Sequence, residues 1–284
     1  LSIRRQRQMC IRDRIRSSSR ITKRIIDTSN HLKIIGRAGV GVDNIDVEAA
    51  TEKGIVVVNS PNGNTLAAAE HTLAMMMSMA RHIPEASKRL HEGHWDKKNL
   101  TGVEISGKTL GVIGLGKIGS HVATVAKAMG MNIVVYDPYA KKEVVEKLNA
   151  KLVDDLENFW HEPDFITIHV PKTKETVNLI NKETIAKMKK GVRLVNCARG
   201  GVVNEADLRE ALDNDYVAGA ALDVFCDEKD ITTSPLYGCE KNLVMTPHLG
   251  ATTFEAQVRV AEDVATQIKI VLQGGKTPNA VNKL

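Results

Sequence analysis

Short apolar runs alternate with amphipathic stretches along most of this 284-residue chain. The alternation predicts strands that are each followed by a helix, which is typical of a parallel sheet covered by helices. The expected strands are Lys33–Gly36, Ile55–Asn59, Thr109–Ile113, Ile133–Tyr136, Asp164–His169, Val192–Asn196, Val217–Leu222 and Leu243–Met245. The expected helices are Val47–Lys53, Asn64–Arg81, a helix from Ile83 to near Gly93, Lys142–Leu148, Asp155–His161, Lys182–Met188, Glu205–Asn214 and Phe254–Leu272, with Gly274 and Gly275 as a stop.

The segment Lys108–Asp137 adds chemistry to this pattern, because a glycine-rich loop joins its first strand to an alanine-rich helix. Gly114 permits the tight turn, Gly116 lets the backbone approach a pyrophosphate, and Gly119 lets the helix pack close to the strand. The helix N-terminus offers N–H groups and a positive dipole end to the phosphates. Asp137 follows the second strand, where its carboxylate suits a ribose diol and repels a 2′-phosphate. The segment therefore predicts a Rossmann-type doubly wound sheet that binds NAD.

The later strands also end in polar residues. In chain order these ends are Asp137, His169, Cys197-Ala198-Arg199, Asp223 and Thr246-Pro247-His248. Ligands of an open doubly wound sheet bind beyond the carboxyl ends of its strands, so these groups gather where a nicotinamide is expected.

Hydride transfer from an alcohol carbon needs a base for the hydroxyl proton and a cation for the substrate's carboxylate or oxyanion. His248 suits the base, and the forked guanidinium of Arg199 suits the cation. Glu228 or Asp227 could pair with the histidine and favour its charged form. Purely structural roles remain open for these residues: Arg199 in a surface turn, His248 as a satisfied strand-end residue, and Glu228 in a solvated acidic loop.

Length and composition fit a protein of about two domains. No apolar run approaches the roughly 18 residues of a membrane helix, so no membrane partner is expected. The four cysteines (Cys10, Cys197, Cys226 and Cys239) have no CxxC spacing and no histidine at metal-ligand spacing. That pattern suits a reducing cytoplasm and predicts neither a disulfide framework nor a metal site.

The positive net charge comes from the start of the chain, because residues 1–24 hold nine lysines and arginines against the single acid Asp13. Such an arm could bind nucleic acid, but no aromatic residues are interleaved with its arginines. The chain begins at Leu1, and residues 1–14 show no fold period. We therefore interpret residues 1–14 as non-native or disordered and expect no nucleic-acid partner.

From about residue 15 to the C-terminus, the chain resembles the D-isomer-specific 2-hydroxyacid dehydrogenase family, and within it the phosphoglycerate dehydrogenases. The resemblance rests on GRAGVGVDNID (36–46), NSPNGNT (59–65), GLGKIG (114–119), HVP (169–171), NCARGG (196–201), ALDVF (221–225) and PHLGA (247–251). It implies a catalytic trio of Arg199, Glu228 and His248. Lys229 follows Glu228 where the family usually has proline, which predicts a less rigid loop.

The resemblance also implies the ligand-binding residues. The implied cofactor site comprises Gly114, Gly116, Lys117, Ile118, Gly119, Asp137, His169, Val170, Pro171, Cys197, Ala198, Arg199, Asp223, His248, Gly250 and Ala251. Within it, the Lys117 and Ile118 amides hold the pyrophosphate, and Asp223 meets the nicotinamide carboxamide. For the substrate, Arg16 and Arg37 resemble phosphate ligands, and the amides of Val40 and Gly41 hold the carboxylate.

The implied architecture is an NAD-binding domain, residues 62–252, and a smaller flavodoxin-like α/β substrate domain made of residues 1–61 and 253–284. Residues 1–14 do not resemble the family's first strand and helix, so the substrate domain is expected to be N-terminally truncated. The implied reaction is NAD-dependent oxidation of 3-phospho-D-glycerate to 3-phosphohydroxypyruvate, in serine synthesis, by a homodimer or homotetramer. The alternatives are a glyoxylate or hydroxypyruvate reductase, another D-2-hydroxyacid dehydrogenase, and an NAD-sensing transcriptional corepressor of the same fold.

Overall fold

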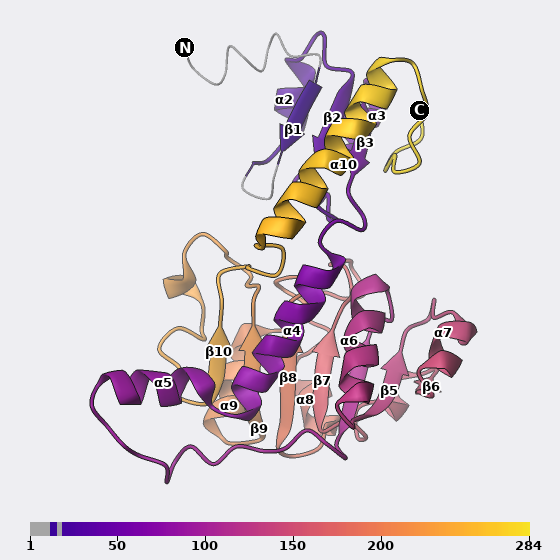
Figure 1. The fold of residues 1–284 in the computed structure, drawn as a ribbon. Helices are drawn as coiled ribbons and strands as arrows, with labels where there is room; N and C mark the ends of the chain where they lie inside the picture. Colours follow the sequence, from indigo (N-terminus) through magenta and orange to yellow (C-terminus); the bar gives the residue numbers. More distant parts are fainter. Residues whose placement is uncertain (1–11, 16–18) are drawn as a thin grey trace. The chain divides into compact units, whose positions relative to one another are not determined.

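The protein forms two compact units in a computed structural model that describes residues 12–15 and 19–284 (Figure 1). Unit 1 contains the described residues up to Ala67 together with Ala251–Leu284, and unit 2 contains Ala68–Gly250. The sequence pattern places the corresponding boundaries after residues 61 and 252. Each unit is organised around its own parallel sheet.

Unit 2 is built on a seven-stranded parallel sheet with the order β10-β9-β8-β7-β4-β5-β6. Its strands are β4 (Thr109–Ile113), β5 (Asn132–Tyr136), β6 (Lys151–Val153), β7 (Phe165–Ile168), β8 (Val192–Asn196), β9 (Val217–Leu222) and β10 (Leu243–Met245). From β4 the chain runs to β6 in one direction, and from β7 it runs to β10 in the other. The strand order therefore reverses between β4 and β7, which confirms the predicted Rossmann-type doubly wound sheet.

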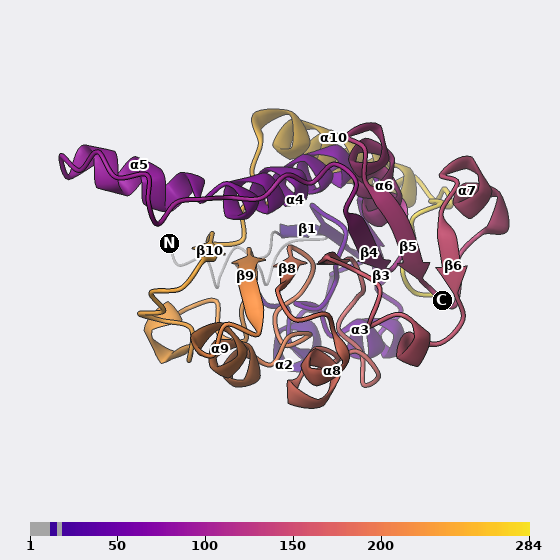
Figure 2. The ribbon, with the colours of Figure 1, turned by 90° about the horizontal axis from the view of Figure 1, so that it is seen from below.

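Helices lie on both faces of this sheet (Figure 2). They are α4 (Thr65–Ala80), α5 (Ile83–His91), α6 (Lys117–Ala128), α7 (Lys142–Lys147), α8 (Lys182–Lys187) and α9 (Glu205–Asp213). α4 and α6 pack on one face, and α8 and α9 pack on the other. Among the described residues, no helix is long and apolar enough to cross a membrane.

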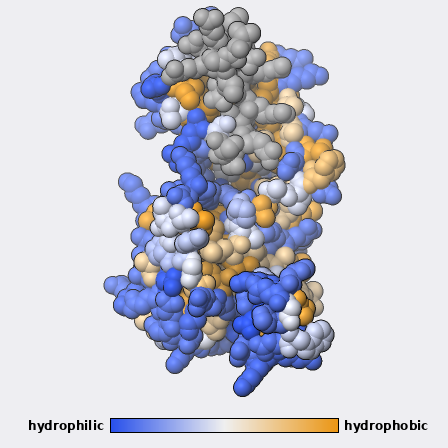
Figure 3. Space-filling model, turned by 90° about the vertical axis from the view of Figure 1, so that its left-hand side faces the viewer, coloured by the Kyte–Doolittle hydropathy of each residue, from blue (hydrophilic) through white to orange (hydrophobic). Residues whose placement is uncertain are grey.

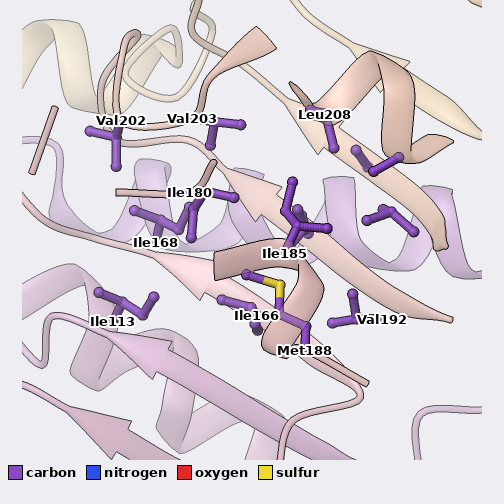
Figure 4. Packing of buried hydrophobic residues seen from close by; sticks show 14 of the residues in the cluster. Ile113, Ile166, Ile168, Ile180, Ile185, Met188, Val192, Val202, Val203 and Leu208 are labelled. Atoms are coloured by element: carbon purple, nitrogen blue, oxygen red, sulfur yellow. The ribbon is translucent and has the colours of Figure 1, made fainter. Parts of the chain in front are cut away.

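The central strands are apolar on both sides because one core lies beneath α8 and α9 and another lies beneath α4 and α6. Ile166 and Ile168 of β7 pack with Ile185 of α8 and Leu208 of α9, and all four are buried (Figure 4). Every residue of β7 is buried, as expected for a parallel strand covered by helices on both faces. Local signals agree with this packing, because Asn181 and Thr184 form a capping box at the start of α8.

Unit 1 has a three-stranded parallel sheet with the order β1-β2-β3. Its elements are β1 (Arg12–Ile15), α2 (Lys23–Asp27), β2 (Ile34–Arg37), α3 (Val47–Glu52), β3 (Val56–Asn59) and α10 (Phe254–Leu272). α10 packs Val264 and Ile268 against Ile34 and Val58. The last residues also join this sheet, because the Val281 N–H donates to the Val57 carbonyl and the Val57 N–H donates to the Asn282 side chain.

A few elements differ from those the sequence predicts. The sequence pattern does not predict the short elements β1, α2 and β6. Residues 12–14, which the sequence analysis interprets as non-native or disordered, belong to β1 and pair with β2, and residues 1–11 lie outside the described residues. The helix expected over Asp155–His161 is only a 3₁₀ turn, Leu156–Asn158, because Phe159 and Trp160 turn inward and pack edge to face in the core.

Candidate functional site

One edge of the sheet in unit 2 carries the strand-end residues that the sequence singles out. All neighbouring strands are parallel, so their carboxyl ends lie at the same edge. In sheet order the residues that follow these ends are His248 (β10), Asp223 (β9), Arg199 (β8), His169 (β7), Gly114 (β4) and Asp137 (β5). The point where the strand order reverses, between β4 and β7, lies within this row and is where such sheets bind ligands.

The glycine loop after β4 has the local geometry that its three glycines predict. Gly114 has φ +92°, which favours glycine. A Cβ on Gly119 would overlap the carbonyl oxygen of Gly114, so α6 can lie this close to β4 only with glycine there. A Cβ on Gly116 would meet no atom within 4 Å, which leaves open space beside the loop. Gly116 is the N-cap of α6 and has no side chain to cap the helix, so this end suits an outside anion.

Asp137 ties the end of β5 to the glycine loop. Its Oδ2 accepts the Leu115 N–H at 2.7 Å, and its Oδ1 accepts the Tyr139 N–H at 2.8 Å. Each carboxylate oxygen has a second lone pair with which to accept a hydroxyl of a ribose. The loop, the uncapped helix end and this acid together fit a dinucleotide whose ribose carries no 2′-phosphate.

His169 lies against the same loop, because a Cβ on Gly114 would come within 2.9 Å of the His169 carbonyl oxygen. The Val170 side chain lies beside the same point. Burial lowers the pKa of His169 to about 4, so its ring is neutral near pH 7. Burial likewise raises the pKa of Cys197 to about 12, so this thiol stays protonated and is a poor nucleophile.

His248 and Glu228 are brought into contact across two loops. The Nδ1 atom of His248 lies 2.9 Å from Oε2 of Glu228, and both side chains are partly exposed. Nε2 is the remaining ring nitrogen that can exchange a proton with a substrate. Asp227, the other acid considered, instead accepts the Lys229 N–H. His248 has φ +55°, a left-handed conformation that is uncommon for residues other than glycine.

Asp223 holds the turn that carries His248. Its side chain is fully buried, and its oxygens accept the Leu249 and Gly250 N–H groups, each at 2.8 Å, and the Thr246 hydroxyl. Burial opposes ionisation of Asp223, but hydrogen bonds from His71, Thr246 and Leu249 outweigh it, so its pKa lies below the ordinary value. The carboxamide contact that the resemblance gives Asp223 stays a prediction.

His71 on α4 is a residue of the site that the sequence does not identify. Its Nε2 lies 3.1 Å from both Asp223 Oδ1 and Thr246 Oγ1, so it supports the same turn from the neighbouring helix. The only sequence signal is a histidine in a largely apolar helix that also carries Glu70 and Thr72, and this identifies no partner.

Arg199 lies in a turn that is fixed on both sides. The side chain of Asn196 accepts the Ala198 N–H and donates to the Arg199 carbonyl, each at 3.0 Å. A Cβ on Gly200 would overlap the Phe225 carbonyl, so the turns after β8 and β9 lie in close contact. The Arg199 guanidinium donates to the Ala198 carbonyl at 2.7 Å.

The predicted substrate residues belong to unit 1. Arg37 ends β2, and its Nη1 donates to the Ala38 carbonyl at 3.0 Å beside Gly39, which has φ +146°. The Val40 carbonyl accepts from the Asn59 side chain at 2.6 Å, which fixes the turn that contains Val40 and Gly41. Arg16 lies outside the described residues.

The other predicted cofactor residues divide between the units. Lys117 and Ile118 begin α6, Pro171 follows His169 and Val170, and Ala198 lies in the Arg199 turn. Gly250 ends unit 2, whereas Ala251 begins the second segment of unit 1. Among the residues that the structure describes, no group of three or more His, Cys, Asp or Glu side chains could hold a metal ion.

Comparisons with known proteins agree with this geometry. The family model described as D-isomer specific 2-hydroxyacid dehydrogenase, NAD binding domain, matches residues 73–250. A D-3-phosphoglycerate dehydrogenase from Synechocystis sp. is 57% identical over 268 residues, which cover 94% of this chain and 48% of that protein. The chain spans about half the length of the curated relatives it matches.

Solved structures give the same picture of the fold. The TT0316 protein from Thermus thermophilus is 35% identical with a TM-score of 0.90, over 98% of this chain and 88% of that chain. A D-lactate dehydrogenase from Aquifex aeolicus, complexed with NAD and lactic acid, is 31% identical with a TM-score of 0.86, over 96% of this chain and 86% of that chain.

Proposed function

Because this chain belongs to the D-isomer-specific 2-hydroxyacid dehydrogenase family, we propose that it reversibly oxidises 3-phospho-D-glycerate to 3-phosphohydroxypyruvate, a step of serine synthesis. The observation that carries the proposal is the 2.9 Å contact between His248 and Glu228. This pair lies at the sheet edge that also carries Arg199 and the glycine loop, so the proposed base, the proposed cation and the proposed dinucleotide site share one edge.

NAD is the cofactor of this domain, since the matched family model describes an NAD binding domain and the loop geometry fits it. When bound, NAD supplies the acceptor and donor of the hydride. The α6 N-terminus would hold its pyrophosphate and Asp137 its ribose diol. We expect Asp137→Ala to lose much of the preference for NAD over NADP, measured as the ratio of kcat/KM for the two cofactors. Equal use of both by the parent protein would contradict this role.

The proton is assigned to His248. In the oxidation direction its neutral Nε2 accepts the hydroxyl proton, and in the reduction direction the protonated ring returns it. Glu228 on Nδ1 holds the ring in place and stabilises its charged form. The fixed turn around Arg199 would orient its guanidinium toward the carboxylate that all 2-hydroxy acids share.

Recognition of the phosphate is proposed for Arg37 and Arg16, and recognition of the carboxylate also for the Val40 and Gly41 amides. These assignments rest on the resemblance of GRAG and RSSS to phosphate-binding positions. The identity to phosphoglycerate dehydrogenases over 94% of the chain supports this choice of substrate.

The test is NADH formation with 3-phospho-D-glycerate beside unphosphorylated D-glycerate, D-lactate and glycolate. We expect kcat/KM to be highest for the phosphorylated acid, because two cations meet its phosphate. Equal or better turnover of the unphosphorylated acids would favour a glyoxylate or hydroxypyruvate reductase. NAD binding without turnover of any of them would favour the corepressor.

We also propose a homodimer or homotetramer. The helix α5 projects from the rest of unit 2 and contains no buried residue (Figure 2). Ile83 and Leu90 of this helix and Trp95 beyond it are more than half exposed. Figure 3 views this side and shows hydrophobic residues in orange among hydrophilic ones in blue. Light scattering measures the mass in solution, and a monomer would contradict the proposal.

A further inference from the structure

We infer that Glu205 positions Glu228 for its contact with His248. Glu205 is the first residue of α9, and its carboxylate bonds to Cys226 and Ser234 and not to Glu228 or His248. It acts on the loop Cys226–Ser234, which contains Glu228. The inference rests on the proposed function, because it assigns a role within the same proton-transfer site.

Glu205 holds this loop at both ends. Its Oε1 accepts the Cys226 N–H at 2.6 Å, and its Oε2 accepts the hydroxyl of Ser234. The Ser234 oxygen in turn accepts the Leu236 N–H at 3.2 Å, and Leu236 is fully buried. One carboxylate therefore joins the start of the loop, its end and the core beneath it.

Packing supports the loop near its end, where Ile231 lies against the core, but not around Glu228. Residues 226–230 are all exposed, and a cavity of about 300 Å³ lies against the loop, lined in part by Glu205, Cys226 and Ser234. Apart from the contact between Glu228 and His248, the other loop bonds are local; for example, Asp227 accepts the Lys229 N–H and Asp230 accepts the Thr232 N–H. The two bonds to Glu205 are thus the ones that anchor the segment around Glu228 to a helix.

A charged carboxylate is needed for this anchor because both of its oxygens act as acceptors. Glu205→Gln keeps the volume of the side chain but has only one acceptor oxygen. If this oxygen accepts the Cys226 N–H, the amide NH2 faces Ser234, whose hydroxyl must turn its proton away and accept instead, so a charge-assisted bond becomes a weaker neutral one. We expect the loop to loosen and Glu228 to stabilise the charged form of His248 less well.

The experiment measures the pH–activity profile of the parent, Glu205→Gln, Glu228→Gln and the double variant. Glu228 favours the protonated ring, so its loss should move the midpoint of the profile to lower pH in both reaction directions. The shift should be small, because both side chains of the pair are partly exposed. Glu205→Gln should shift the midpoint in the same direction by a smaller amount. In the Glu228→Gln background it should cause no further shift.

Asp207→Asn is the matched control. Asp207 lies on the same turn of α9 and its side chain also accepts a backbone N–H, from Lys182 at 2.9 Å, but it does not touch the loop. This variant should leave the midpoint unchanged. A thermal melt of each variant separates the two roles, because a purely structural role of Glu205 would lower Tm without moving the midpoint.

Two results would overturn the inference. One is a midpoint that Glu228→Gln shifts and Glu205→Gln leaves unchanged. The other is a shift by Glu205→Gln that is as large in the Glu228→Gln background as in the parent protein. NMR of the His248 ring through a pH titration gives the same comparison without turnover. A parent protein that binds NAD but oxidises no 2-hydroxy acid would refute the proposed function, and the NMR midpoints would still decide the role of Glu205.

Discussion

Unit 2 is one continuous stretch of chain, Ala68–Gly250, whereas unit 1 is assembled from an early segment and from Ala251–Leu284. The difference shows in how each sheet is completed. In unit 2 the helices α6, α8 and α9 lie close in sequence to the strands that they cover. In unit 1 the small sheet depends on α10 and on a tail that pairs with β3. The groups proposed for proton transfer and most of those proposed for NAD lie in the continuous unit, and Arg37, proposed for the phosphate, lies in the composite one.

Local sequence pattern is sufficient to predict structure where a strand and its helix are neighbours along the chain. A strand-to-helix unit with a glycine loop specifies its own geometry, so its ligand site can be read from a short stretch of sequence. The sheet of unit 1 needs contacts between segments some 200 residues apart, such as the bond from Gln267 to the Asn59 carbonyl. Changes in the two units should therefore have separable effects.

The largest effect is expected from His248→Ala in unit 2. Loss of the base should lower kcat by about 10²-fold or more, because general acid–base catalysis contributes that much. NAD should still bind, as measured by calorimetry, since the glycine loop lies several strands away. Retention of most of the activity would place the base elsewhere.

Ile268→Ala tests whether unit 1 depends on α10. Ile268 is buried against Ile34 and Val58, so its truncation should cost about 2–5 kcal/mol of stability. Hydrogen exchange should rise in β2 and β3 and stay unchanged in β4 and β7. Val258→Ala, at a more exposed position of the same helix, is the control. Equal loss of protection in both sheets would show that the units unfold together.

Arg37→Ala tests whether the phosphate and the carboxylate of the substrate are bound by different units. If Arg37 binds phosphate, this change should weaken binding of 3-phospho-D-glycerate by about 1.5–3 kcal/mol, or roughly 10- to 150-fold in KM. Turnover of an unphosphorylated 2-hydroxy acid should barely change. Arg199→Ala should harm both substrates alike, because it is proposed to hold the shared carboxylate. Equal losses for both substrates in Arg37→Ala would instead indicate a structural role at the end of β2.

The smallest effects are expected from alanine at two glycines of the loop after β4, Gly119 and Gly116, which should differ in stability and in NAD affinity. Gly119→Ala should destabilise unit 2 by about 1–3 kcal/mol, because its Cβ overlaps the Gly114 carbonyl. Gly116→Ala has open space and φ −69°, so its Tm should fall only by the small cost of a poorer N-cap, while NAD binds more weakly. Calorimetric melts and NAD titrations measure both quantities. Unaltered NAD affinity in Gly116→Ala would mean that the pyrophosphate does not approach this glycine.

The sequence predicts those features that depend on neighbouring residues. The bounds of α10 are as expected because Thr253 caps its start and Gly274, with φ +82°, follows its end. The Rossmann-type sheet follows from the order of strands, loop and acid. The helix predicted after Asp155 is wrong because the burial of Phe159 and Trp160 depends on a distant core.

The supports of the site could not be predicted in the same way. His71 meets Asp223 from a helix more than 150 residues earlier, and Glu205 meets a loop about 20 residues later. Each is an ordinary polar residue on its own helix until the fold brings its partner to it. The choice between Asp227 and Glu228 as the neighbour of His248 likewise needed the loop conformation.

The tail that pairs with β3 has a consequence for the order of events during synthesis. A ribosome that has released Gly250 has already supplied all of unit 2, but the sheet of unit 1 still lacks α10 and residues 280–282. At about 5–20 residues per second the delay lasts roughly a few seconds. During that time Ile34 and Val58 have no helix to cover them and are open to chaperones. Arrest-peptide measurements should therefore show two separate folding steps, with unit 2 first.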